Sequence, residues 1–508
     1  MQPLPPESII AVIGSGAMGA GIAQIAATAG HRVLLFDTRP GAADEAIAQV
    51  GATWARLVAK GRMGAVESDL ARERLRSVDS LQAAAGAALV IEAIVENLEV
   101  KRALFAEIEN VVSTTCILAT NTSSISVTAI GAQLAHPERL VGMHFFNPAP
   151  LMALVEVVSG LATDQKIADV VYATAEKWGK SPVHAKSTPG FIVNRVARPF
   201  YAEALRLLLE QSADVATLDA VMRDCGGFRM GPFELMDLIG HDVNFSVTNS
   251  VFAAYFGDPR FTPSVLQQEL VNAGFLGRKT GRGFYRYGDD AAKPVAQAEA
   301  ACDRPAAVKY AGGPGSVDAL IARVQAASIA MTAIEAAPGL YCAGAAIYLT
   351  DGRSATERAQ ADNHRDTIVF DLLLDAASAP RIALARADRC SDDAWCAAVG
   401  LFQAAGFVVT CLDDVPGLAV MRTVAMLANE AADAVHQGVC SARAVDIAMQ
   451  KGVNYPRGPL AWLDAIGMGQ VVTVLANLAA TYGEDRYRVA PLLRRKLAAD
   501  PQGARFHV

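Results

Sequence analysis

The chain has 508 residues and a formal net charge of −7, with 52% hydrophobic and 19% charged residues. A chain of this length exceeds one hydrophobic core, so we expect a globular protein of two to four domains of about 100–200 residues each, and the composition excludes extensive disorder. The negative balance argues against nucleic acid and anionic membranes as partners.

The N-terminal segment and the cysteines favour a cytoplasmic protein. Residues 1–7 lack the basic segment and apolar run of a secretory signal, and no apolar stretch approaches the roughly 18 residues of a membrane span. The eight cysteines include no Cys-x-x-Cys pair. We therefore expect buried, reduced thiols, with neither a disulfide framework nor a metal site.

Apolar runs alternate with helical segments in the first third of the chain, which predicts a parallel α/β sheet. The predicted strands are residues 9–13, 32–36, 88–91, 117–119, 140–143 and 154–158. A longer helical stretch at 43–81 carries Arg56, Lys60 and Arg62 close together, and an insertion of this size often serves binding.

A glycine-rich loop follows the first predicted strand. Gly14, Gly16 and Gly19 precede a helical segment, and glycines at this spacing allow a tight turn and close approach of the backbone to a pyrophosphate. Asp37 ends the next strand, where a carboxylate accepts hydrogen bonds from ribose hydroxyls and repels a 2′-phosphate. The pattern predicts a Rossmann-type domain that favours NAD over NADP, while these residues alone leave FAD open.

The alternation stops near Pro189-Gly190, and the rest of the chain divides into three further parts. We predict a Rossmann-type NAD-binding domain at 7–187, an all-α domain at 188–290, a degenerate Rossmann-like α/β module at 300–412 and a second copy of the α domain at 413–508. Strand-like runs at 368–372, 382–385 and 407–411 support the module.

A constant spacing of 227 residues supports the duplication. It relates Pro189-Gly190 to Pro416-Gly417, Arg195 to Arg422, Glu203 to Glu430, Asp219 to Asp446, Gly231-Pro232 to Gly458-Pro459, and Asp237 to Asp464. One ungapped offset over about 50 positions indicates an internal repeat, with the second copy at about 415–470.

His144 and Glu156 are the strongest candidates for acid–base chemistry. His144 closes one predicted strand, and Glu156 lies inside the apolar run 154–158, where a carboxylate either points to solvent or needs a polar partner. A dyad would let the imidazole take a proton while the carboxylate fixes its tautomer. The spacing alone also allows the alternative of a buried histidine whose hydrogen bonds are made within the core and that has no catalytic role.

Other polar residues carry no signal individually. Ser123 and Asn194 read by default as turn or capping residues, and Lys60, Lys101 and Lys279 as solvated surface charges.

The chain nevertheless resembles the 3-hydroxyacyl-CoA dehydrogenases. The stretches that carry the resemblance are His144-Phe145-Phe146-Asn147-Pro148, Gly190-Phe191-Ile192-Val193-Asn194-Arg195, Ile91-Glu92-Ala93-Ile94-Val95-Glu96-Asn97, Asn121-Thr122-Ser123-Ser124, Leu154-Val155-Glu156-Val157, Gly231-Pro232-Phe233-Glu234-Leu235 and Gly277-Arg278-Lys279-Thr280-Gly281. They span about 9–287 in the family's order, and the full length resembles a long bacterial form that acts on 3-hydroxybutyryl-CoA or 3-hydroxyadipyl-CoA.

The resemblance implies the reaction, NAD-dependent oxidation of a (3S)-3-hydroxyacyl-CoA to the 3-oxoacyl-CoA, and the role of each matched residue. His144 is then the base, Glu156 orients it, and Ser123 and Asn194 hold the substrate oxygen and the histidine. The implied cofactor contacts are Gly14, Gly16, Ala17, Met18, Gly19, Asp37, Glu96, Lys101, Ser123 and Lys279. The implied CoA contacts are Thr53, Lys60 and Ser123, with a threonine where many members carry serine.

The second copy departs from the family where the chemistry would lie. The position 227 residues after Asn194 is Met421, which cannot make an asparagine's hydrogen bonds, and Gly312-Gly313-Pro314-Gly315 lacks the spacing of a dinucleotide loop. We therefore expect one active site.

Two alternatives remain beside this reading. The first is a dehydrogenase of another small hydroxy acid on the same two-domain plan, and the second is a catalytically retired protein kept for nucleotide binding. We also expect the two helical copies to pack against each other as partner subunits would, with a homo-oligomer through another surface still open.

Overall fold

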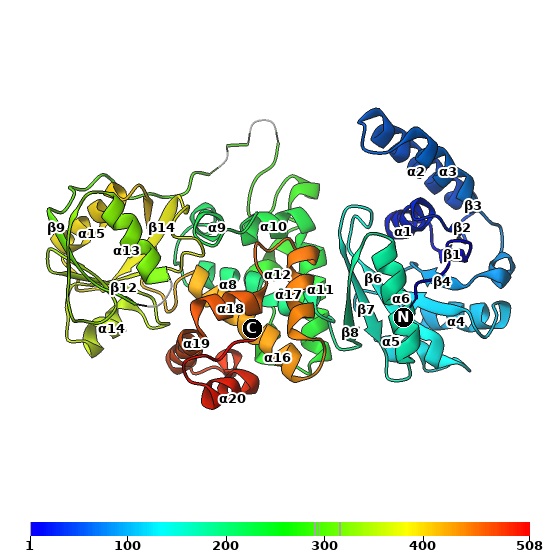
Figure 1. Ribbon diagram of the computed structural model, residues 1–508. Coiled ribbons are helices and arrows are strands. Elements are labelled where there is room, and N and C mark those ends of the chain that lie inside the picture. Colours follow the sequence, from blue (N-terminus) through cyan, green and yellow to red (C-terminus); the bar gives the residue numbers. More distant parts are fainter. Residues whose placement is uncertain (1, 289–290, 293, 314–315, 508) are drawn as a thin grey trace. The chain divides into compact units, whose positions relative to one another are not determined.

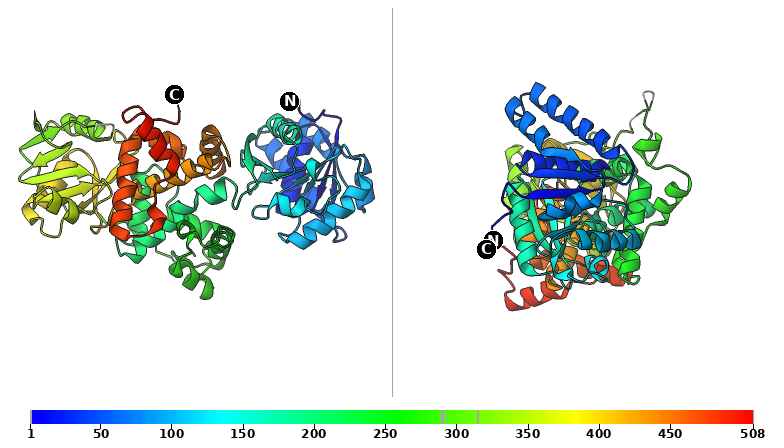
Figure 2. Two further views of the ribbon diagram at one scale, coloured as in Figure 1. Left: turned by 90° about the horizontal axis from the view of Figure 1, so that it is seen from below. Right: turned by 90° about the vertical axis from the view of Figure 1, so that its right-hand side faces the viewer.

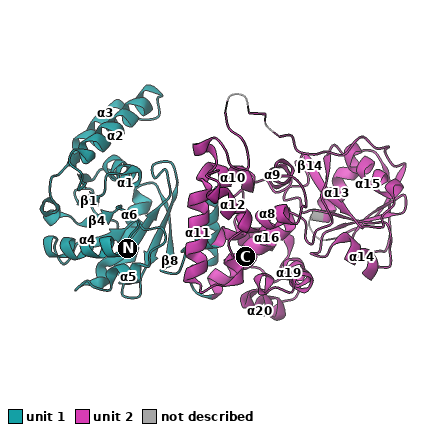
Figure 3. Cartoon of the chain, turned by 180° about the vertical axis from the view of Figure 1, so that it is seen from behind, with its two compact units in different colours: residues 1–195, 437–454 teal, residues 196–436, 455–508 magenta. Residues whose placement is uncertain are grey.

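The computed structural model describes residues 2–288, 291–292, 294–313 and 316–507. The chain forms two compact units (Figure 3): unit 1 comprises residues 1–195 and 437–454, and unit 2 comprises residues 196–436 and 455–508. Unit 1 therefore includes a segment from the far end of the chain.

Unit 1 is built on an eight-stranded sheet with the order β3-β2-β1-β4-β5-β6-β7-β8. Its described pairs are parallel except for β6 and β7. The strands are β1 (Ile9–Ile13), β2 (Arg32–Phe36), β3 (Leu75–Ser77), β4 (Leu89–Glu92), β5 (Ile117–Thr120), β6 (Leu140–Phe145), β7 (Leu154–Ser159) and β8 (Ser181–Lys186). The central strands are buried on both faces, because helices cover a parallel sheet on each side.

The helices of unit 1 follow the predicted alternation (Figure 1). They are α1 (Ala17–Thr28), α2 (Ala42–Ala59), α3 (Ala65–Arg74), α4 (Leu98–Val111), α5 (Val127–Gly131), α6 (Gln165–Lys177), the first residues of α7 (Val193–Val196), and α17 (Ala442–Gly452), with the short 3₁₀ helices η1 (Leu81–Gly86) and η2 (Pro137–Arg139). The single helical stretch predicted at 43–81 is instead the pair α2 and α3, which projects from the rest of the unit, followed by β3 (Figure 2). Gly61 and Gly64 separate the two helices, and β3 is too short and polar to show an apolar run.

Unit 2 contains helices and a second sheet. Its helices are α8 (Arg198–Leu209), α9 (Val215–Asp224), α10 (Pro232–Ile239), α11 (His241–Ala254), α12 (Val265–Asn272), α13 (Ser316–Ala326), α14 (Ala355–Ala361), α15 (Asp392–Ala404), α16 (Val420–His436), α18 (Pro459–Ile466), α19 (Met468–Tyr482) and α20 (Pro491–Ala499), with the 3₁₀ helices η3 (Pro259–Phe261), η4 (Arg278–Thr280) and η5 (Asp485–Tyr487).

The second sheet has seven strands in the order β10-β9-β11-β12-β13-β14-β15. The strands are β9 (Ala307–Ala311), β10 (Ala330–Ala333), β11 (Gly339–Cys342), β12 (Ala345–Leu349), β13 (Thr367–Phe370), β14 (Arg381–Arg386) and β15 (Val408–Cys411). Strands β9 to β12 were not predicted from the sequence, because they are short and β9, β10 and β12 each contain two alanines, a residue that strands disfavour.

The internal repeat is longer than the sequence indicated. The helix α6 begins at Gln165 and α15 at Asp392, 227 residues later, and both run for 13 residues. The antiparallel pairing of Met143 with Val157 recurs as Phe370 with Leu384 at the same offset. The first copy is therefore residues 140–272 and the second 367–499, so much of the α/β module belongs to the repeat.

Backbone geometry repeats as well. Gly190 and Gly417 have φ values of 74° and 75°, and Phe191 and Leu418, which follow them, have φ values of 46° and 52°. A positive φ is uncommon outside glycine, so its recurrence at the same step supports a duplicated turn.

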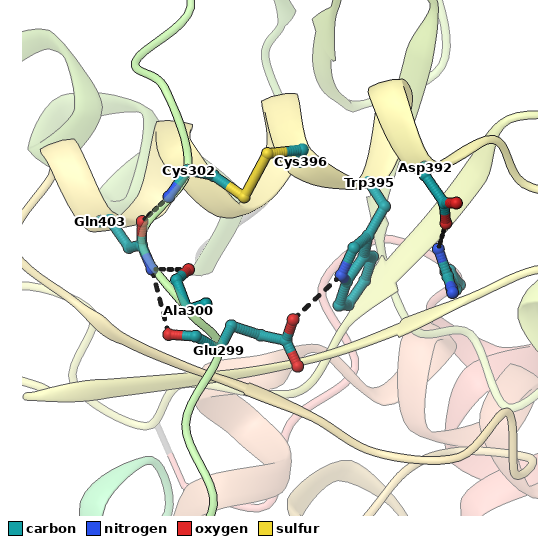
Figure 4. The surroundings of a disulfide bond; sticks show 8 residues. Glu299, Ala300, Cys302, Asp392, Trp395, Cys396 and Gln403 are labelled. Atoms are coloured by element: carbon teal, nitrogen blue, oxygen red, sulfur yellow. Dashed lines mark hydrogen bonds and ion pairs between the residues drawn. A yellow bond between two sulfur atoms is a disulfide. The ribbon is translucent and has the colours of Figure 1, made fainter.

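The expectation of reduced cysteines throughout is wrong for one pair. Cys302 and Cys396 form a disulfide between residues 94 apart in sequence (Figure 4). Gln403 lies on α15, as Cys396 does, and its side-chain oxygen accepts a hydrogen bond from the backbone N–H of Cys302. This contact holds the segment that carries Cys302 against the helix. Such a distant pair leaves no local spacing signal. The other six cysteines are free.

No single helix among the described residues is long and apolar enough to span a membrane. Only α18 and α19 taken together reach that length and composition, and they are bent by 100° at their junction.

Candidate active site

His144 and Glu156 are direct cross-strand partners in the antiparallel pair β6 and β7. Their side chains lie on the same face, because opposed residues of paired strands point the same way, and His144 Nδ1 lies 2.7 Å from Glu156 Oε2. Glu156 is fully buried and His144 is 5% exposed. The geometry selects the dyad over an isolated core histidine.

Glu156 also fixes the backbone that carries Asn194. Its Oε1 accepts hydrogen bonds from the backbone N–H groups of Ile192 and Val193, at 3.0 and 2.9 Å. These N–H groups stand at the start of α7, where intrahelical partners are lacking. One carboxylate therefore orients the histidine and anchors the asparagine turn.

Ser123 and Asn194 meet beside this pair. Asn194 Nδ2 donates to the backbone carbonyl of Ser123 at 3.3 Å. The backbone N–H and hydroxyl of Ser123 both donate to Glu96 Oε1. Joint geometry thus brings together Ser123, Asn194 and Glu96, which only the family resemblance had linked, since residue type and spacing gave no reason to associate them.

Glu96 is held ionised. Burial would raise its pKa, but hydrogen bonds from Thr122, Ser123 and Ser124 and the charge of Lys101 outweigh that effect and lower the pKa.

Lys101 is not the solvated charge that its residue type suggests. It is 1% exposed, and its Nζ contacts Glu92 Oε1 at 2.5 Å and Glu96 Oε2 at 3.4 Å. Glu92, fully buried at the end of β4, also accepts from Thr120 Oγ1 at 2.7 Å. The sequence reading quoted Glu92 but gave it no role, although a carboxylate closing an apolar strand is a signal for a paired buried charge.

A pocket of 320 Å³ joins these side chains. Its lining includes Met18, Glu96, Lys101, Ser123, His144 and Asn194 from the predicted set, together with Ala93, Ile94, Asn121, Phe145, Phe146 and Asn147. Asn121 was also missed as a site residue, and its Oδ1 accepts from the backbone N–H of Phe145 at 2.9 Å.

The glycine loop has the shape that a dinucleotide needs. A Cβ on Gly14 would lie 2.6 Å from a backbone oxygen of Ala93, and one on Gly19 would lie 1.8 Å from the oxygen of Gly14, so packing requires glycine at both positions. A Cβ on Gly16 would meet nothing within 4 Å, which leaves open space at the N-terminus of α1, where no side chain caps the helix. The loop therefore accommodates a pyrophosphate.

Asp37 stands beside that loop. Its Oδ2 accepts from Ser15 N and Ser15 Oγ, at 2.8 and 2.7 Å, and its Oδ1 accepts from Arg39 N at 3.0 Å. Burial opposes ionisation, but these hydrogen bonds outweigh it and lower the pKa of Asp37. The carboxylate is therefore ionised at neutral pH and placed at the end of β2.

The candidate CoA residues lie apart from the catalytic pocket. Thr53 and Arg62 line a groove of 810 Å³ between α1 and α2, whereas Lys60 is exposed and does not line it. Lys177 and Lys180 line the same groove and had no sequence signal. Burial lowers the pKa of Lys180 to about 8, and its ammonium is held by the carbonyls of Ala149 and Met152.

Lys279 belongs to unit 2. Its Nζ contacts both carboxylate oxygens of Asp242 at 2.6 Å, and its side chain is 46% exposed.

The second copy replaces the polar residues of the first. At the offset of 227, His144 becomes Asp371, Glu156 becomes Ala383 and Asn194 becomes Met421. Asp371 has a structural role, because it accepts hydrogen bonds from the backbone N–H groups of Ala419, Val420 and Met421. Within the described residues this copy has no histidine–carboxylate pair at that position; the glycine stretch 312–315 lies partly outside them.

Comparison with known proteins agrees with this geometry. The family model of the 3-hydroxyacyl-CoA dehydrogenase NAD binding domain matches residues 9–188, and that of the C-terminal domain matches 190–287 and again 417–505. A third model, the 3-hydroxybutyryl-CoA dehydrogenase reduced Rossmann-fold domain, matches 347–416.

Individual relatives cover either the whole chain or its first half. A 3-hydroxyadipyl-CoA dehydrogenase of Escherichia coli is 44% identical over 487 residues, 96% of this chain and 97% of that protein. A probable 3-hydroxybutyryl-CoA dehydrogenase of Bacillus subtilis is 41% identical over a stretch that covers 55% of this chain and 96% of that protein. A crystal structure titled 3-hydroxybutyryl-CoA dehydrogenase from Escherichia coli superposes with a TM-score of 0.89 at 42% identity, covering 97% of this chain and 99% of the other.

Proposed function

The chain belongs to the 3-hydroxyacyl-CoA dehydrogenase family, and from that premise we propose that it oxidises the 3-hydroxyl group of a 3-hydroxyacyl-CoA to a ketone with NAD as cofactor. The observation that carries the proposal is the buried pair of His144 and Glu156, 2.7 Å apart, whose histidine lines a pocket together with Ser123 and Asn194.

The dyad supplies the base. Because Nδ1 of His144 faces Glu156, the carboxylate holds the ring proton there and leaves Nε2 with a lone pair. Nε2 takes the proton of the substrate hydroxyl, and Glu156 stabilises the imidazolium that forms. Ser123 and Asn194 position the substrate oxygen. When bound, NAD supplies the acceptor for the hydride that leaves C3.

The loop of Gly14, Gly16 and Gly19 and the carboxylate of Asp37 would hold the cofactor. We assign Ala17, Met18, Glu96, Lys101 and Lys279 to cofactor contacts as the family resemblance implies. Thr53 and Lys60 remain our assignments for CoA, joined by Arg62, because a phosphate needs an exposed cation and Arg62 lines the groove.

The proposal is tested by following NADH absorbance as the purified protein meets acetoacetyl-CoA. Wild type should consume NADH, and His144→Gln should be slower by about 10²–10⁴-fold, the usual contribution of a general base. His136→Gln is the matched control, because His136 pairs with Glu138 on the surface of the same unit. Undiminished turnover in His144→Gln would remove this residue as the base.

The thioester class needs its own measurement. Free acetoacetate should be a poor substrate, since it lacks the CoA part, whereas efficient reduction of the free acid would favour the alternative of a small hydroxy acid dehydrogenase. The named relatives act on hydroxyadipyl or hydroxybutyryl thioesters, and a panel of both decides between them, because acyl selectivity depends on several side chains together.

We further propose that the second copy serves the first as a built-in partner subunit. Within unit 2, α16 packs on α8, and the fully buried Arg422 of α16 contacts Glu203 of α8 at 2.7 Å. Each copy also places a helix on the sheet of the other. Helix α17 of the second copy packs on β7 and β8 in unit 1, and α9 of the first copy packs on β14 in unit 2.

This arrangement predicts oligomeric behaviour. A chain ending at residue 288 should self-associate or become insoluble, because it exposes the faces that the second copy covers. A soluble, monomeric and fully active short chain would contradict the proposal. We also assign the enzyme to the cytoplasm, which cell fractionation followed by the NADH assay would test.

A further inference from the structure

A buried arginine in unit 2 has no acidic partner. Arg198, the first residue of α8, is 5% exposed. Its Nη1 donates to Thr248 Oγ1 at 3.0 Å, and its guanidinium lies 4.9 Å from the centroid of the Tyr201 ring. Its Nε is buried and has no hydrogen-bond partner among the described residues.

Within the part of the chain that the structure describes, no carboxylate forms an ion pair with Arg198. Its electrostatic neighbours are the neutral phenols Tyr201 and Tyr455, and burial lowers its pKa. An unpaired buried charge is costly, so buried arginines normally sit against carboxylates.

The other arginines nearby follow that rule. Arg206 contacts Glu484 at 2.6 Å, Arg260 contacts Asp433 at 2.7 Å, and Arg486 contacts Glu203 at 3.1 Å. Arg198 is the exception in this part of the unit.

Arg198 lines a pocket of 480 Å³ that lies entirely within unit 2. The walls include apolar side chains from α8 and from the segment that leads into α12, namely Leu205, Leu209, Phe261, Pro263 and Val265. The charged residues Arg206, Glu210, Arg260 and Arg486 also line the pocket, and each of them is in an ion pair. Among the described lining residues Arg198 is therefore the uncompensated cation, beside a wall suited to methylene groups.

The second copy shows that the helices do not need this cation. At the offset of 227, Arg198, Tyr201 and Thr248 become Ala425, Ala428 and Leu475, all fully buried. The same helical packing is thus made with small or apolar side chains, and the polar set in the first copy calls for a reason other than folding.

We propose that this pocket binds the carboxylate of a short aliphatic chain, with Arg198 as the counter-ion and the apolar wall against the chain. The carboxylate would accept from the guanidinium of Arg198 where it borders the pocket, and the desolvated charge pair would offset the burial of the arginine. The ligand is a free carboxylic acid, because the pocket and its arginine lie within unit 2 alone.

The first experiment titrates the full-length protein with hexanoate and adipate by calorimetry. We expect saturable binding, with hexanamide, the uncharged analogue, at least about tenfold weaker. The double variant Arg198→Ala, Thr248→Leu should lose at least about tenfold in affinity, and it introduces two of the three residues that stand at these positions in the second copy, Ala425 and Leu475.

A second variant guards against misfolding of the first. Val265 lines the pocket and is 61% exposed, so Val265→Glu places a competing carboxylate at the mouth without disturbing a core. Val243→Glu is its matched control, because Val243 is 48% exposed on α11 and does not line the pocket. Only the substitution at Val265 should weaken binding.

The second experiment repeats these titrations on the variants. If the free acids bind to wild type and the variants at Arg198 and Val265 weaken that binding, the pocket takes a free carboxylate. The proposal is overturned if wild type binds neither acid, or if the variants leave the affinity unchanged. Failure of wild type to oxidise 3-hydroxybutyryl-CoA would instead count against the proposed function and leave the titration valid.

Discussion

Replacing Glu156 by glutamine is the sharpest test of the site, because the substitution keeps the shape and replaces one carboxylate oxygen, an acceptor, by an amide NH2 group, a donor. The amide oxygen can still accept from Ile192 and Val193, so the turn that carries Asn194 stays anchored. The amide nitrogen then faces His144 Nδ1 and can only donate to it, which places the ring proton on Nε2. The nitrogen that must accept the substrate proton is then already protonated.

We expect kcat to fall by about 10²–10⁴-fold, equivalent to about 3–5 kcal/mol in the activation barrier. The assay is NADH formation from NAD and 3-hydroxybutyryl-CoA, the direction in which Nε2 must accept a proton, with a circular dichroism melt to confirm the fold. Glu138→Gln is the control, because Glu138 contacts His136 at 3.1 Å in an exposed pair and should behave as wild type.

Two results would refute this reasoning. Folded Glu156→Gln enzyme with activity within about threefold of wild type would show that the carboxylate does not set the tautomer. Combining Glu156→Gln with His144→Gln should cost little more than His144→Gln alone, since residues acting as one unit are not additive. A multiplicative loss would mean that the two act separately.

Three further predictions concern other parts of the molecule. Gly19→Ala should weaken NAD binding at least tenfold and lower the melting temperature, because its Cβ would meet a backbone oxygen at 1.8 Å. Gly16→Ala has open space around its Cβ, so it should weaken NAD binding without a loss of stability. Calorimetry measures the binding and melting curves measure the stability. Burial raises the pKa of Asp219 to about 7, above the unfolded value of about 3.9, so the native state retains a proton between these values and stability should fall as pH rises from about 4 to 7. Asp219→Asn should remove this loss of stability, which amounts to at most about 4 kcal/mol over the range, in thermal unfolding measured at several pH values. An unchanged pH dependence would mean that another group causes it. Glu203→Gln should destabilise unit 2 by about 3–5 kcal/mol in denaturant unfolding, because it leaves Arg422 buried without its main carboxylate, and a neutral result would mean that the pair contributes little to the packing of α8 on α16.

The local order of the chain was readable from the sequence because local chemistry decides it. The loop from Gly14 to Gly19 must turn tightly after β1, and the structure places α1 directly behind it. The same is true of the strand that carries His144 and the apolar run around Glu156. Strands β3 and β8 to β12 were missed, since their short or polar segments become strands only by pairing with neighbours.

The chemistry of individual polar residues was decided in three dimensions. Lys101 reads in sequence as an ordinary surface lysine, yet its burial against Glu92 depends on how β4 and α4 pack. The pairing of Cys302 with Cys396 joins segments 94 residues apart, and no spacing rule anticipates it.

The sequence by itself determined the dinucleotide loop, the acidic residue that follows it, the family and the presence of a repeat, because each is written in residue types at fixed spacing. Only the tertiary structure decided that His144 and Glu156 form a pair, that the repeat reaches into the α/β module, and that Arg198 is buried without a counter-charge. Those properties depend on which distant side chains share a space, and the strength of a charge depends on what surrounds it.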